Sequence, residues 1–145
     1  MVAVIHQVQG RSNDARAAYQ RILDVDARAV VANNNLAYIY AEEGKDLDMA
    51  LQMAQAAKAA SPEDPDVSDT LGWVYYKKDM ATQAIGPLLQ SIRVNPNNPL
   101  YHYHLGLAYQ KNGERAKAIT ALERAVQLGN FPELDAAKRA LENLR

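Results

Sequence analysis

A spacing of 34 residues recurs along this chain of 145 residues and restricts its fold more than any other feature. The pair Leu71-Gly72 recurs as Leu105-Gly106, 34 residues later, and Tyr75 recurs as Tyr109 at the same distance. Other positions keep this spacing: Ala50, Ala84 and Ala118; Ala54, Leu88 and Leu122; Pro62 and Pro96. A fixed period of this length is typical of repeat proteins, in which each unit packs against its neighbours.

The repeat divides the chain into about three full units and part of a fourth. Leu36-Ala37 and Tyr40 match the later units with a spacing of 35, because one residue is inserted in "EEGKDLDMA". We therefore predict one solenoid with these parts: a truncated unit 1–29, full units 30–64, 65–98 and 99–131, and a capping helix 132–145.

The truncated unit has a further implication. Its register begins before Met1, so we expect a fragment or C-terminal segment of a longer repeat protein. An apolar set on its first helix would then lack a neighbour: Val2, Val4, Ile5 and Val8.

Composition narrows the class of protein. A hydrophobic content of 48% with 23% charged residues is typical of a globular domain. The net charge of -1 offers no basic field for nucleic acid or an anionic membrane surface. The chain has no cysteine, which excludes disulfides, thiolate metal sites and a cysteine nucleophile. Neither a signal peptide nor a membrane-spanning run is recognisable, and cytoplasm and periplasm both stay open.

Turn residues predict where the helices begin and end. Asp64 and Asn98 are suited to cap the helices that follow them, which would begin with Pro65 and Pro99. Glycine or aspartate stands between the paired helices, where a left-handed backbone is commonly needed: Gly10, Gly44, Asp79 and Gly113. The junction "DARAV" lacks both signals. We expect helices near 2–9, 13–25, 30–43, 47–60, 65–78, 81–94, 99–112, 115–128 and 132–143.

Glycine inside a predicted helix indicates close packing. Gly72 and Gly106 each cost roughly 1 kcal/mol relative to alanine in a helix. A missing side chain lets the second helix approach, and Ala84 and Ala118 are small at the facing positions.

The C-terminal segment has one apolar stripe and one charged face, which predicts a helix that caps the array and keeps it soluble. The stripe consists of Leu134, Ala137, Leu141 and Leu144.

The Leu-Gly, Tyr, Ala and Pro positions of the 34-residue unit resemble the tetratricopeptide repeat. The resemblance covers nearly the whole chain and implies an all-α fold, a right-handed superhelical solenoid of antiparallel helix pairs. It also implies a concave groove, lined by the first helix of each pair, that holds a peptide or helix of a partner protein. The phrases "NNNLAYIYAEEGKDLDMAL", "DTLGWVYYKK" and "YHYHLGLAYQKNG" are similar, more specifically, to bacterial repeat proteins of exopolysaccharide and exosortase-linked loci.

Helix geometry predicts which residues line that groove. On the helix with Trp73, residues 66, 69, 73 and 76 share one side, opposite Leu71 and Tyr75. The predicted peptide-binding residues are Asn34, Tyr38, Asp66, Asp69, Trp73, Tyr76, Lys77, Tyr103, Leu107 and Gln110. Tryptophan and tyrosine are enriched among binding hot spots. The alternative is that these aromatic side chains only fill gaps between helices.

The groove residues also predict the chemistry of the ligand. Some family members clamp an acidic C-terminal peptide with Lys, Asn and Arg, whereas the corresponding places here hold Asn34, Tyr38, Thr70, Leu100 and His104. We therefore expect an apolar or aromatic ligand, with a basic residue near Asp66 and Asp69.

No pattern in the sequence predicts catalysis, a cofactor or a metal site. His102 and His104 lie roughly 200° apart around a helix and cannot share a metal ion. The acidic pairs "DLD" and "DPD" lack the glycine and distal Glu of a calcium loop. Two functions remain: an adaptor that binds a partner in the groove, and an assembly module that self-associates through its N-terminal half-repeat.

Overall fold

The computed structural model describes residues 12–145, and these form eight helices and no strand. The helices are α2 Ser12–Val25, α3 Val30–Glu43, α4 Leu47–Ala60, α5 Pro65–Lys77, α6 Ala81–Val94, α7 Pro99–Lys111, α8 Arg115–Leu128 and α9 Leu134–Leu144. The predicted all-α solenoid is therefore confirmed, with helix bounds within two residues of those expected. The expected helix 2–9 and its apolar set, Val2, Val4, Ile5 and Val8, lie outside the described residues.

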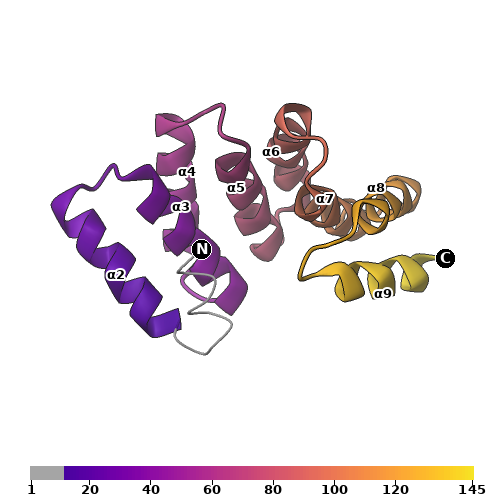
Figure 1. Ribbon diagram of the computed structural model, residues 1–145, viewed down its shortest axis with the longest axis horizontal. Coiled ribbons are helices and arrows are strands. Elements are labelled where there is room, and N and C mark those ends of the chain that lie inside the picture. The colour runs from indigo at the N-terminus through magenta and orange to yellow at the C-terminus, as the bar shows by residue number, and fades with distance from the viewer. Residues whose placement is uncertain (1–11) are drawn as a thin grey trace.

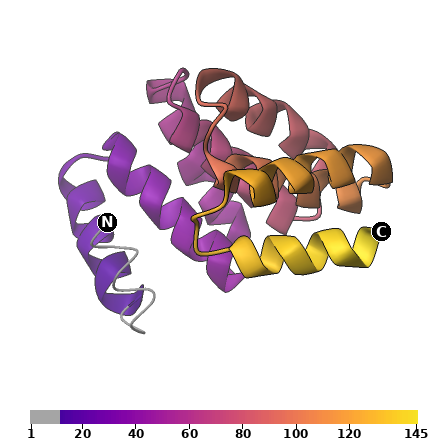
Figure 2. The ribbon, with the colours of Figure 1, turned by 45° about the vertical axis from the view of Figure 1, so that its right-hand side comes forward.

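The helices form successive antiparallel pairs, α3 with α4, α5 with α6 and α7 with α8, and α9 lies against α8 (Figure 1, Figure 2). The first helices of neighbouring pairs pack on one another, α3 on α5 and α5 on α7, more closely than the second helices do. The array therefore curves toward its first helices, which form the inner, concave side.

In the pairs α5–α6 and α7–α8, a glycine of the first helix leaves room for a leucine of the second helix. A Cβ added to Gly72 would lie 2.5 Å from Cγ of Leu88, and one added to Gly106 would lie 2.6 Å from Cγ of Leu122. Both leucines are fully buried. The predicted close approach is confirmed, and burial of a whole leucine side chain, at about 1.5 to 3 kcal/mol, offsets the helix penalty of glycine.

The predicted turn chemistry is also confirmed within residues 12–145, and Gly10 lies outside them. Gly44, Asp79 and Gly113 have φ of 70°, 61° and 79°, the left-handed backbone that ends the first helix of each pair. Asp64 Oδ1 accepts a hydrogen bond of 2.9 Å from the Asp66 N–H, and Asn98 Oδ1 accepts one of 3.0 Å from the Leu100 N–H. These caps fix where α5 and α7 begin, and so fix the register of the side chains on the inner side.

One lysine ties neighbouring units together on the outer side. The Lys58 ammonium donates to the Pro62 carbonyl at 2.6 Å, to Ser68 Oγ at 2.7 Å and to Gln90 Oε1 at 2.8 Å. These bonds join α4 to α5 and α6. Burial lowers the pKa of the Lys58 ammonium, as expected for a cation partly withdrawn from water.

Candidate functional site

The candidate site is the concave side of the array, which we call the inner surface. It is formed by Asn34, Tyr38 and Glu42 of α3, Asp69, Trp73, Tyr76 and Lys77 of α5, and Tyr103, His104, Leu107 and Gln110 of α7, with Phe131 and Glu133 from the α8–α9 linker. These residues recur every three or four positions along each helix, so each helix turns one stripe inward.

Trp73 lies at the centre of this surface and is 6% exposed. Its ring stacks on His104 at 4.0 Å between centroids and on Tyr76 at 5.0 Å. Its indole Nε1 donates a hydrogen bond of 2.6 Å to Glu42 Oε1 on α3. Trp73 therefore joins all three first helices. The ring fills the space between α5 and α7, so Trp73 contributes to packing, as in the alternative that the aromatic side chains fill gaps between helices.

The two aspartates expected to face a ligand each accept a hydrogen bond from α7, and one of them is buried. Asp69 is 3% exposed, and its Oδ1 accepts a 2.8 Å hydrogen bond from Nδ1 of the buried His104. The Asp66 carboxylate accepts a hydrogen bond from the Tyr101 hydroxyl. Each bond joins α5 to α7 across 35 residues of sequence. Both bonds strengthen the array, but they differ in what they leave for a ligand: Asp69 is buried, whereas Asp66 is exposed and stays accessible.

A row of partly exposed side chains remains accessible on the inner surface. Four of its side chains are partly buried and partly exposed: Tyr38, Tyr76, Tyr103 and Leu107. Gln110 continues the row and is exposed. The row draws on three neighbouring helices, and it presents aromatic and aliphatic surface with hydroxyl and amide groups at its edge.

Two lysines lie over aromatic rings at the end of this row. The Lys77 ammonium is 5.2 Å from the centroid of the Trp73 ring, and the Lys111 ammonium is 4.0 Å from that of Tyr76. Sequence reasoning selected Lys77 and missed Lys111. The signal was present, because the two lysines are 34 residues apart and so occupy the same place in successive units.

The α8–α9 linker adds two residues that sequence reasoning did not select. The ring of Phe131 packs edge-on against Tyr103 at 6.2 Å. Glu133 is half-buried, and burial raises the pKa of its carboxyl. A backbone hydrogen bond and His104 offset part of this rise, and Glu42 and Asp69 add slightly to it. The capping helix was expected from residue 132, which would have placed Glu133 within it. The structure begins α9 at Leu134 and leaves Glu133 in the linker.

The inner surface is electrostatically negative around Tyr38. Burial raises the pKa of the Tyr38 hydroxyl, and the nearby carboxylates of Glu42, Asp69 and Glu133 raise it further. Asn34 lies one turn before Tyr38 on the same stripe, and its Oδ1 is buried with no hydrogen-bond donor among the described residues.

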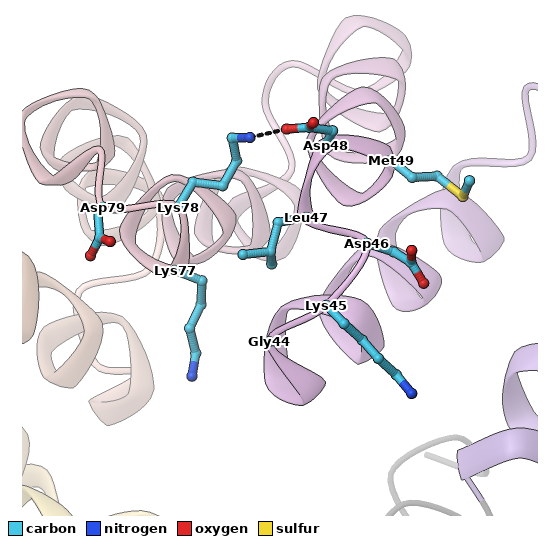
Figure 3. Close-up of a pocket in the computed structure, with 9 residues that line it drawn as sticks. All are labelled: Gly44, Lys45, Asp46, Leu47, Asp48, Met49, Lys77, Lys78 and Asp79. Atoms are coloured by element: carbon cyan, nitrogen blue, oxygen red, sulfur yellow. Dashed lines mark hydrogen bonds and ion pairs between the residues drawn. The ribbon is translucent and has the colours of Figure 1, made fainter.

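A hollow of about 650 Å³ lies beside the inner surface, where α3 and α5 end (Figure 3). Residues 44–49 and 77–79 line it, and an ion pair from Lys78 to Asp48 closes one side. Lys45 and Lys77 both extend away from this ion pair, on the opposite side of the hollow (Figure 3). No aromatic side chain lines the hollow, so it offers a charged rim rather than an anchor for a ligand.

Within residues 12–145, no three histidine or acidic side chains lie close enough to hold a metal ion. In the same range, no helix combines the length and apolar character needed to cross a membrane.

Three family models match the chain. A model described as "Tetratricopeptide repeat" matches residues 3–65, another with the same description matches residues 99–130, and one described as "TPR repeat" matches residues 72–113. Together they span most of the sequence.

Two curated proteins are also similar to part of the chain. The chain is 35% identical over 77 residues to the peroxisomal targeting signal receptor of Saccharomyces cerevisiae, covering 53% of this chain and 13% of the receptor. A receptor of the same name from Candida glabrata is 34% identical over 65 residues, covering 45% of this chain and 11% of its own length. The chain thus spans only a small part of these relatives.

Among solved structures, TTC0263, a thermophilic TPR protein of Thermus thermophilus, superposes with a TM-score of 0.83 at 27% identity. The superposition covers 99% of this chain and 77% of that one. A crystal structure of MamA gives a TM-score of 0.75 at 22% identity, covering 99% and 82%. At that identity the likeness to MamA shows the fold alone.

Proposed function

Because the chain belongs to the tetratricopeptide repeat family, we propose that its inner surface binds a peptide or helix of a partner protein, as a scaffold or adaptor. Members of this family are in general protein-interaction modules rather than enzymes. The relatives from both yeasts carry the name of a receptor, which supports a binding role.

One observation carries the proposal: the row of half-buried side chains Tyr38, Tyr76, Tyr103 and Leu107 along three adjacent first helices. Large aromatic side chains that keep one open edge can bury further area against a ligand at a small cost in conformational entropy. The ligand should therefore present apolar or aromatic side chains. The amide of Gln110 and the hydroxyl groups of the tyrosines can orient it by hydrogen bonds.

Affinity capture with matched variants tests this proposal. The immobilised chain would be compared with Tyr76→Ala/Leu107→Ala after incubation in a lysate of the source organism, with captured proteins identified by mass spectrometry. We expect the double variant to lose the partners that the unaltered chain retains. The matched control is Leu89→Ala/Val94→Ala, which removes two exposed apolar side chains from α6 instead. Identical partners for all three proteins would contradict binding at the inner surface.

Self-association is a second candidate, and one observation favours it. Four exposed large apolar residues lie on α2 to α4: Ile22, Val25, Val31 and Met49. Val25 and Val31 are 90% and 67% exposed. Apolar side chains gain roughly 1.5 to 3 kcal/mol each when fully buried, so a second copy packed on this end would be stabilised. Sedimentation velocity at two concentrations, with and without Val25→Ser/Val31→Ser, tests it. A monomer at both concentrations would contradict self-association.

The finer resemblance to repeat proteins of bacterial exopolysaccharide and exosortase-linked loci is also a proposal, and it rests on shared phrases such as "DTLGWVYYKK". The genes that surround this one in the source genome provide the test. Neighbours without any polysaccharide or sorting enzyme would contradict it.

A further inference from the structure

We infer that the outer side of the array binds an acidic amphipathic helix of a partner protein, in an apolar furrow between α6 and α8. This furrow, which we call the outer furrow, has a volume of about 650 Å³, within the range of ligand-binding clefts. The residues that line it are separate from those of the inner surface, so the outer furrow is a second binding surface and stands independently of the proposed function.

The outer furrow exists because the array curves toward its first helices. The first helices pack closely, and the second helices α6 and α8 are consequently held apart. Leu105 and Tyr109 of α7 form the floor between them, and Leu89 and Ile92 of α6 form one wall. Leu105 is buried, whereas the other three side chains keep part of their surface accessible. The furrow therefore exposes aliphatic and aromatic surface that is continuous with the core around Leu105.

The equivalent furrow one unit earlier, between α4 and α6, is closed by the chain itself. Its residues stand 34 positions before those of the outer furrow. The Lys58 ammonium donates to Gln90 Oε1 at 2.8 Å, and the Gln90 amide donates to the Pro62 carbonyl at 3.0 Å. The Gln55 amide donates a further hydrogen bond of 3.4 Å to the Tyr75 hydroxyl. Polar side chains thus bridge the two second helices in that unit.

The outer furrow has no residues that could form this bridge. At the three corresponding positions it has Leu89, Ile92 and Arg124 in place of glutamine, lysine and glutamine. The two apolar side chains cannot form hydrogen bonds, and Arg124 is exposed and makes no ion pair within residues 12–145. Exposed apolar surface with a polar rim is typical of a protein-interaction site. The chain therefore leaves open in this unit the furrow that it closes in the unit before.

The rim of the outer furrow is basic. Lys117 and Arg124 of α8 line it, and no acidic side chain of the described range does. The preceding unit has glutamine at both positions, so the two cations are particular to this furrow. The Lys117 ammonium lies 5.6 Å from the centroid of the Tyr109 ring and makes one ion pair, of 3.3 Å, with Glu114. An occupant that carries carboxylates beside apolar side chains would match the furrow in both charge and polarity.

The spacing of the two cations favours a helix as the occupant. Lys117 and Arg124 are seven residues apart, which is two turns and about 10.5 Å along α8. A partner helix laid along α8 can present two carboxylates seven residues apart to these cations, because residues two turns apart share one face. Its apolar side chains, at intervals of three and four, would face the floor of the furrow. The bound helix would then pack between α6 and α8.

A variant that copies the preceding unit provides the test. Ile92→Lys/Arg124→Gln introduces the two residue types that bridge the earlier furrow, and it leaves the net charge unchanged. Phage-displayed peptides of about 18 residues, or five helical turns, would be selected on the unaltered chain. We expect one class of binders to lose affinity for this variant, by about tenfold or more, because the apolar wall and one cation are both removed.

The sequences and structure of this class test the chemistry of the occupant. We expect Asp or Glu beside apolar residues at helical spacing, and circular dichroism should show that the peptides become helical when bound. Fluorescence anisotropy of a labelled binder should show about threefold weaker binding to Arg124→Gln, as for an exposed ion pair. The same peptide with Gln in place of its acidic residues should bind Arg124→Gln and the unaltered chain equally.

Arg139→Gln on α9 is the matched control, because Arg139 does not line the outer furrow. It should leave the affinity of these peptides unchanged. A circular-dichroism melt of each variant shows that it is folded. If Ile92→Lys/Arg124→Gln does not fold, Arg124→Gln alone carries the test, since it changes only one exposed side chain.

Several outcomes would overturn the outer furrow as a binding site for an acidic helix. One is a library without any binder that is weakened by Ile92→Lys/Arg124→Gln. Another is a class of weakened binders that have no acidic residue or stay unfolded when bound. A third is that the unaltered chain binds dodecanoate, the variant does not, and no peptide is selected at this place, which would identify a lipid site instead.

The two surfaces succeed or fail separately. Peptides weakened only by Tyr76→Ala/Leu107→Ala belong to the inner surface and give no support to the outer furrow. Leu89→Ala/Val94→Ala removes one residue of the outer furrow and none of the inner surface. It should therefore weaken the furrow binders while leaving binding at the inner surface unchanged.

Discussion

The interior of the helix pairs and the inner surface are built in opposite ways. Inside the pairs the same contact is repeated, with Gly72 and Gly106 each receiving a leucine at nearly the same distance, 2.5 Å and 2.6 Å from the built Cβ. On the inner surface most side chains change from unit to unit: the place of Trp73 is taken by Tyr38 before it and by Leu107 after it.

This difference shows which part of the sequence is free to specify a partner. Every unit needs the interior contact to stack, so its positions repeat. The inner surface has no such repeated contact. Trp73, His104 and Asp69 join its helices, and the partly exposed side chains around them are free to vary. Its particular set of aromatic and acidic groups is therefore what distinguishes this chain from another array of the same fold. The following predictions test whether the interior of the helix pairs and the inner surface differ in this way.

The largest effect on stability is expected from His104→Ala, on the inner surface. The variant loses the stack on Trp73 and leaves the buried Asp69 carboxylate without its donor. A lost aromatic pair and an unsatisfied buried acceptor together should lower the free energy of unfolding by about 2 to 4 kcal/mol. Urea denaturation followed by circular dichroism measures this. Trp73 is the one tryptophan of the chain, so its fluorescence should change as well.

His102→Ala is the matched control on the same helix. His102 bonds only the Pro96 carbonyl and is partly exposed. We expect a change within about 0.5 kcal/mol, as for most surface substitutions. Equal losses for the two variants would show that the polar network on the inner surface does not contribute specially to stability.

The second-largest effect on stability is expected from Gly72→Leu, in the interior of the pair α5–α6. A side chain here would collide with Leu88 and with the Ala84 carbonyl oxygen, which lies 3.1 Å from the built Cβ. Overpacking should lower the free energy of unfolding by about 1 to 3 kcal/mol. Gly86→Ala is the control, because nothing lies within 4 Å of a Cβ at that helical glycine. A melting temperature unchanged in Gly72→Leu would contradict the close approach.

The sequence alone predicts the interior of the helix pairs but only part of the inner surface, and both results have one physical reason. The period of 34 predicts the helix pairs, and the isolated cap signals at Asp64 and Asn98 predict helix starts, because both depend on local or repeated chemistry. The bond from Trp73 to Glu42 joins residues 31 apart and has no counterpart in other units. A helix stripe says which side a residue faces but not how deeply a neighbouring helix buries it. The sequence therefore predicts the side of α5 on which Trp73 and Asp69 lie, but not that both are buried.

The smallest effect concerns Glu133, where the inner surface should weaken the fold rather than strengthen it. Burial raises the pKa of this carboxyl above its ordinary 4.5, so the folded state holds its proton more tightly than the unfolded state does. Well below pH 4.5 both states are protonated and the group has no effect on stability. As the pH rises from about 4.5 through the raised pKa, the unfolded state ionises first and stability falls. Glu133→Gln lacks this loss, so its advantage should appear only above pH 4.5.

The advantage of Glu133→Gln should stay below about 1 kcal/mol, because the half-exposed side chain is screened by solvent. Urea denaturation at pH 4 and at pH 7 measures it. Glu114→Gln provides a control of opposite sign. Hydrogen bonds from Asn112 and Lys117 lower the pKa of Glu114, so its contribution is present above the ordinary pKa and is lost as the pH falls. The two variants should therefore respond to pH in opposite directions. A shared response would mean that the Glu133 carboxyl is no more buried than that of the exposed Glu114.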